Sequence, residues 1–137
     1  NWGIVMAWVA ITNNISTEVV ILYTSAIFWT LGYDTIYGTQ DVTDDEIIGI
    51  KSTSIKFKNN IKLFVGSCYF INSALIIFLF YKKLGLNSST LLMTIYILSL
   101  IYQIIKFRKN DPKECLKNFK VNNLSGLFLF SGIFLIS

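Results

Sequence analysis

The chain has 137 residues, of which 53% are hydrophobic and 15% are charged, and its formal net charge is +4. Soluble domains carry about 25% charged residues, more than this chain does. A chain so apolar and so poor in charge does not stay disordered. Its composition indicates a multi-span membrane protein. The chain has two cysteines and no histidine, which excludes histidine-based triads and leaves too few ligands for a zinc site. The basic residues gather in loops without interleaved aromatics, so we expect no nucleic-acid partner.

Apolar runs predict an all-α membrane protein, a helical bundle formed by a single domain over residues 1–137. We expect the spans at about 2–11, 17–37, 62–81, 89–106 and 120–136. The first run is too short to cross a bilayer, which takes about 20 residues. Because the chain also begins without methionine, we expect it to be a piece of a longer protein.

The polar segments between these runs differ in charge. Four lysines follow the second run, and six basic residues lie between 106 and 120, against two on the other side of the predicted membrane. Positive residues favour the cytoplasmic side, so we expect both segments there. Pro112 is well suited to begin a short amphipathic helix before the last span.

The segment 33–53 holds five of the eight acidic residues of the chain. If the second helix continues to Asp45, spacings of seven and eleven place Asp34, Asp41 and Asp45 on one narrow stripe. Three carboxylates on one stripe need a cation between them, or one of them must stay protonated. Mg²⁺ fits the first option, because it takes one or two carboxylates together with phosphate oxygens. Gly38 lies near the stripe, where a missing side chain would let a ligand approach the backbone.

The acidic segment also has interpretations other than a Mg²⁺ site. Some of these are excluded or disfavoured, and others stay open. An EF-hand is excluded because Glu46 stands where the loop requires glycine. An ion transporter would place carboxylates inside its spans. A solvated connector remains open, and Tyr37 also suits the aromatic belt at a membrane interface.

A family resemblance rests on specific residues of this segment. The pattern resembles the second aspartate-rich motif of the UbiA-type intramembrane prenyltransferases, and more narrowly the 4-hydroxybenzoate polyprenyltransferase branch. Two flanking patterns are similar to the same branch. The three patterns are Tyr33-Asp34-Thr35-x-Tyr37-Gly38-x-x-Asp41-x-x-Asp44-Asp45-x-x-x-Gly49-Ile50-Lys51-Ser52-Thr53, Met6-Ala7-Trp8, and Cys115-x-x-x-Phe119-x-x-Asn122-Asn123-x-x-Gly126.

The resemblance implies a nine-helix bundle in a bacterial inner membrane, of which this chain supplies about five helices, the C-terminal half. It implies Mg²⁺-dependent transfer of a polyprenyl group from its diphosphate to 4-hydroxybenzoate, at the carbon ortho to the hydroxyl, in ubiquinone biosynthesis. The carried-over roles are metal and diphosphate binding for Asp41 and Asp45, and diphosphate contact for Lys51. Asp34 and Tyr37 would line the acceptor site. Ser52 follows Lys51 directly, and from this position alone we expect its hydroxyl to donate a hydrogen bond to a phosphate.

The family's first aspartate-rich motif, Asn-x-x-x-Asp-x-x-x-Asp, is not in this sequence. We therefore expect the missing N-terminal half of the same protein to be a partner, and the chain alone to be inactive. Two alternatives stay open: a sibling prenyltransferase with a menaquinone-type aromatic acceptor, and an inactive truncated remnant.

Overall fold

The computed structural model describes residues 1–108 and 111–136, and within these ranges it contains helices and no strand. The all-α prediction is confirmed. The α-helices are α1 (Trp2–Thr12), α2 (Thr17–Gly38), α3 (Val42–Ile48), α4 (Thr53–Lys56), α5 (Ile61–Phe80), α6 (Ser88–Lys106) and α7 (Pro112–Phe134), and a short 3₁₀ turn η1 covers Tyr81–Lys83. Lys109, one of the basic residues used to predict sidedness, lies outside the described residues.

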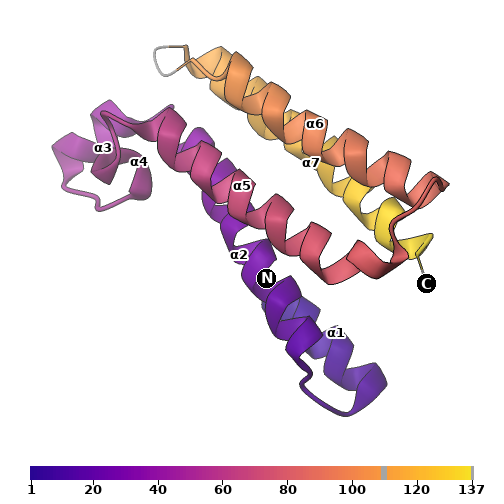
Figure 1. Cartoon of the computed structure of the whole chain (residues 1–137). Helices are drawn as coiled ribbons and strands as arrows, with labels where there is room; N and C mark the ends of the chain where they lie inside the picture. The colour runs from indigo at the N-terminus through magenta and orange to yellow at the C-terminus, as the bar shows by residue number, and fades with distance from the viewer. Residues whose placement is uncertain (109–110, 137) are drawn as a thin grey trace.

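The bundle is built from two helix pairs. Figure 1 shows α2 and α5 lying side by side, and α6 and α7 forming a second pair against them. The helices α3 and α4 gather where α2 ends, and α1 packs on the beginning of α2. The acidic segment therefore lies at one end of the bundle, and the α1–α2 turn lies at the other.

Three helices are long and apolar enough to cross a membrane: Thr17–Gly38, Ile61–Lys83 and Ser88–Lys106. Most of their residues are not buried inside the described chain, as expected for helices that face lipid. The apolar helix Trp2–Thr12 is shorter. The predicted total of five spans stays a prediction.

The last polar segment differs from the expectation. We predicted a short amphipathic helix before a separate span at 120–136, but α7 runs without a break from Pro112 to Phe134. Asp111 caps this helix, because its carboxylate accepts hydrogen bonds from the amides of Lys113 and Glu114. After Pro112, which occupies the first helical position, no glycine or proline interrupts the sequence before the apolar run, so the helix continues.

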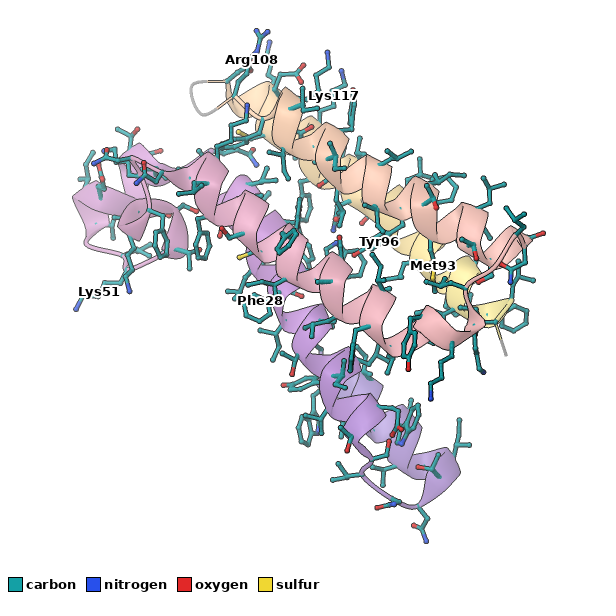
Figure 2. All side chains as sticks on the ribbon, viewed as in Figure 1. Phe28, Lys51, Met93, Tyr96, Arg108 and Lys117 are labelled. Carbon is teal, nitrogen blue, oxygen red and sulfur yellow. The ribbon has the colours of Figure 1, made fainter. Side chains whose placement is uncertain are left out.

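Buried polar side chains connect the two pairs. Asn72 on α5 donates to Ser25 Oγ on α2 at 2.8 Å and accepts from Tyr96 OH on α6 at 2.6 Å. Tyr96 lies between the pairs in Figure 2. A second chain of bonds runs from Tyr69 OH to Gln103 Oε1 at 2.9 Å, and from Gln103 Nε2 to Ser125 Oγ at 3.1 Å. Such bonds specify helix pairing in an apolar medium, where burial alone is not selective.

Candidate active site

The chain breaks between the second helix and the acidic residues that follow it. The helix α2 ends at Gly38, where the amides of Thr39 and Gln40 donate to carbonyls only three residues back. The new helix α3 begins after Asp41. The expected continuous helix to Asp45 is therefore wrong, and the stripe of three carboxylates that depended on it does not form.

The predicted carboxylates lie instead on two elements. Asp34 stands exposed on α2, while Asp41 precedes α3 and Asp45 lies on its first turn. The amide of Asp45 donates to the carbonyl of Asp41 at 2.8 Å, so these two residues are one helical turn apart on the same face. Among the described residues, no three His, Cys, Asp or Glu side chains form a group that could hold a metal ion. The chain therefore offers a pair of carboxylates.

Hydroxyl groups fasten α4 onto the end of α2. Ser54 Oγ donates to the carbonyl of Thr35 at 3.0 Å, and the hydroxyl oxygens of Thr35 and Thr53 lie 2.8 Å apart. Thr39 Oγ1 donates to the same Thr35 carbonyl at 2.7 Å. Thr35, Thr39 and Ser54 are buried. We call these four residues the hydroxyl cluster; it fixes where the segment after the carboxylates returns to the bundle.

Gly38 has a packing role within this arrangement. A Cβ atom at this position would lie 2.7 Å from Ser54 Oγ. The missing side chain therefore makes room for Ser54. Since Ser54 occupies this space, the expectation that a ligand approaches the backbone here is not supported.

The turn after α3 is set by Gly49. Its φ of 80° lies in the left-handed region, which costs glycine least. The amides of Gly49 and Ile50 donate to the carbonyls of Glu46 and Asp45, a glycine-terminated helix end. Across the turn, Lys58 Nζ pairs with the Glu46 carboxylate at 2.6 Å. These contacts fix α3 relative to α4.

The predicted substrate residues Lys51 and Ser52 line one pocket of about 430 Å³, together with Ile50, Thr53, Ile55 and Lys56. Lys51 is exposed, and its side chain points away from the bundle in Figure 2. Ser52 has a structural role as well, because its hydroxyl accepts the amide of Ile55 and caps α4. The pocket joins two lysines with hydroxyl groups, a combination suited to phosphate oxygens.

Tyr37 contacts the last helix rather than the other predicted site residues. Its ring centroid lies 4.7 Å from that of Phe119, and Tyr33 lies 6.0 Å from the same ring. One further turn along α2, Trp29 Nε1 donates to Asn122 Oδ1 at 2.8 Å. Gly126 lies against Trp29, where a Cβ would approach the indole to 3.0 Å. The end of α2 that carries Asp34 is thus held by α7.

Residue spacing in both helices signals this contact, although we did not predict it from the sequence. Trp29, Tyr33 and Tyr37 are spaced by four residues, and Phe119, Asn122 and Gly126 by three and four. Both spacings place their members on one helical face. The contacts of Thr53 and Ser54 with Thr35 had no comparable signal in the sequence, because they depend on where α4 folds back.

Known proteins resemble this chain along nearly its whole length. The sequence model of the UbiA prenyltransferase family matches residues 1–131. A Bos taurus protein named 4-hydroxybenzoate polyprenyltransferase, mitochondrial, is 35% identical over 98% of this chain and 37% of its own length. Proteins named 4-hydroxybenzoate octaprenyltransferase from Saccharophagus degradans and Xylella fastidiosa are 33% and 36% identical, each over 96% of this chain and 44% of its own length.

The chain thus spans between 37% and 44% of the length of these relatives. No solved structure matches it.

Proposed function

The chain belongs to the UbiA prenyltransferase family, and we propose that it forms the C-terminal part of the active site of a 4-hydroxybenzoate polyprenyltransferase. The proposal rests on similarity, over nearly the whole chain, to proteins of that name. In the proposed reaction, the allylic C–O bond of a polyprenyl diphosphate breaks and its electron pair leaves with the diphosphate. The ring carbon ortho to the hydroxyl of 4-hydroxybenzoate then bonds to the allylic carbon, and a ring proton is lost.

Asp41 and Asp45 suit Mg²⁺ as a pair of ligands. They lie one turn apart on one face, and no ion pair of either with a lysine or arginine is formed in residues 1–108 and 111–136. Mg²⁺ commonly takes one or two protein carboxylates and completes its coordination with phosphate oxygens and water. When bound, Mg²⁺ supplies positive charge against the departing diphosphate.

The other proposed roles follow from position. Lys51 and the Ser52 hydroxyl line a pocket just after α3 and would bind diphosphate oxygens there. Asp34 and Tyr37 lie about one turn apart on α2, and we propose that both line the acceptor site. Since Tyr37 is packed on Phe119, its ring has a fixed direction for such a contact.

The proposed location is the inner membrane of a bacterium, with α3 and α4 on the cytoplasmic side. The basic residues that follow α2 and flank the α6–α7 turn support this orientation. We further propose that the remainder of the site comes from an N-terminal half, so that the chain by itself does not transfer prenyl groups.

The test joins this chain to the N-terminal part of the Saccharophagus degradans relative and assays the membranes with a polyprenyl diphosphate and labelled 4-hydroxybenzoate. Asp41→Asn and Asp45→Asn should each lower kcat by about 100-fold or more, the scale of losing a charge-stabilising group. Asp44→Asn is the matched control, because it removes a carboxylate from the same turn, about 100° around the helix from Asp45 and about 60° from Asp41.

Each result distinguishes the alternatives. Prenylation of a naphthoate-type acid in place of 4-hydroxybenzoate would assign the sibling reaction. Equal losses in all three variants would remove the special role of Asp41 and Asp45. Activity from the 137-residue chain alone would contradict the proposed need for an N-terminal half.

A further inference from the structure

A cavity lies at the end of the bundle opposite the carboxylates. Its volume is about 600 Å³, within the range of about 300–1,000 Å³ that is usual for ligand sites. The first residues of α2 line it, whereas Asp41 follows the last residues of the same helix. The cavity is therefore separate from the proposed active site. We call it the distal cavity; its walls include Trp8, Leu22, Phe78, Phe80 and Ile133, with Lys82 and Lys83 beside them.

The walls of the distal cavity are mainly apolar and come from four helices. Trp8 belongs to α1, Leu22 to α2, Phe78 and Phe80 to α5, and Ile133 to α7. Leu22, Phe80 and Ile133 pack partly against the core, while Phe78 is 62% exposed. Such walls suit a flexible hydrocarbon chain, which packs against them through van der Waals contacts and needs no directional partner.

Polar groups converge beside these walls. Lys82 and Lys83 are exposed in η1, where the span of α5 ends. Trp8 Nε1 is buried and has no hydrogen-bond acceptor among the residues that the structure describes. A buried donor without an acceptor is costly, so an oxygen-rich group at this position would be stabilised. Among the described residues that line the cavity, one carboxylate, Glu18, stands against two lysines, so positive charge prevails.

We propose that the distal cavity binds an anionic phospholipid. The lysines and the Trp8 N–H bind the headgroup oxygens, and an acyl chain lies along the aromatic and aliphatic walls. This occupant combines the two features of the cavity, because its anionic phosphate and its hydrocarbon chain belong to one molecule. Basic residues at the end of a span contribute about 1 kcal/mol each toward anionic lipid, so two of them give a clear preference over zwitterionic lipid.

The experiment measures quenching of tryptophan fluorescence by dibrominated phosphatidylglycerol in micelles of the purified chain. We expect a saturable component that Trp8→Phe removes. The double variant Lys82→Gln/Lys83→Gln should raise the half-saturating mole fraction by about 30-fold. The matched control Lys62→Gln/Lys120→Gln removes the same charge at the other end of the bundle and should leave this component unchanged.

A second variant tests the cavity itself. Ile21→Phe adds volume to a wall residue and keeps both lysines, so it should weaken lipid binding while circular dichroism shows an unchanged helix content. Equal quenching by dibrominated phosphatidylcholine would overturn the proposal. It would also be overturned by an equal loss in the control pair, or by a saturable component that persists in Trp8→Phe. None of these outcomes depends on prenyl transfer.

Discussion

Trp29 and Asn122 are joined by a hydrogen bond of 2.8 Å across 93 residues of sequence. Trp29 also stands edge-on to Tyr33 and Tyr96, with ring centroids 5.9 and 5.8 Å away. This one indole therefore contacts its own helix, α6 and α7. The position of the aromatic face of α2 therefore depends on its contacts with α7.

Removing the Asn122 side chain should destabilise the bundle. Asn122→Ala breaks the bond and leaves the Trp29 N–H unpaired, at a cost of about 1–2 kcal/mol. Unfolding in mixed micelles measures the change. The adjacent Asn123→Ala is the control, because Asn123 is exposed on the same helix and should change stability by less than about 0.5 kcal/mol. Equal effects at both positions would contradict this role of the bond.

Asn72 should be more sensitive, because its side chain serves two helices at once. Asn72→Leu leaves the Tyr96 hydroxyl without its acceptor and removes both side-chain bonds to Ser25, although Ser25 Oγ keeps its bond to the backbone carbonyl of residue 72. We expect a loss of about 2–3 kcal/mol. A double-mutant cycle with Tyr96→Phe should show coupling of about 0.5–1.5 kcal/mol. Additive effects in that cycle would mean that the Asn72–Tyr96 bond contributes nothing to stability.

Gly38→Ala should release α4 from the end of α2. The new methyl group would displace Ser54 Oγ from the Thr35 carbonyl, and hydrogen exchange of the α4 amides should accelerate. Adding Ser54→Ala removes the crowding, so the double variant should show no further loss beyond that of Ser54→Ala alone. Gly66→Ala is the control, because nothing lies within 4 Å of its added Cβ. It should stabilise α5 by up to about 1 kcal/mol.

Cys115 should resist alkylation at neutral pH. It is 0% exposed, and burial, with the nearby charges of Asp111 and Glu114, raises its pKa to about 11. Its unfolded form loses its proton near pH 9, so the stability that the buried thiol contributes is present below pH 9 and is lost as pH rises toward 11. Iodoacetamide kinetics on a Cys68→Ala background measure the reactivity of the thiol, and unfolding in mixed micelles at pH values between about 8 and about 11 measures the loss of stability. Rapid labelling of the folded chain at about pH 7.5 would contradict the predicted resistance.

The apolar runs predicted the helices well, because a span must bury its own backbone polar groups. The expected segments 17–37, 62–81 and 89–106 correspond to helices at Thr17–Gly38, Ile61–Phe80 and Ser88–Lys106. The limits of α7 were predicted poorly. Its first part carries lysines, and composition alone does not distinguish a polar loop from the polar beginning of a continuous helix.

Within the candidate site, the residue types were easier to predict than their arrangement. The carboxylates near the end of α2 were evident from their density in the sequence. Their division between α2 and α3 was not, because the break depends on Thr39 bonding back to Thr35 and on Ser54 packing against Gly38. The Ser54 contact forms only when α4 folds back, while the Thr39–Thr35 bond spans four residues at the end of α2. A periodicity argument assumes that the helix has no such interruption.

The dependence of α2 on α7 has a consequence for biosynthesis. At a synthesis rate of about 5–20 residues per second, the 93 residues between Trp29 and Asn122 take roughly 5–20 s to emerge. During that interval α2 is already made, while the Trp29 N–H lacks Asn122 and the rings of Tyr33 and Tyr37 lack Phe119. A ribosome that stops before Phe119 therefore leaves α2 packed against α1, α4 and α5 but without the contacts that α7 makes with Trp29, Tyr33 and Tyr37.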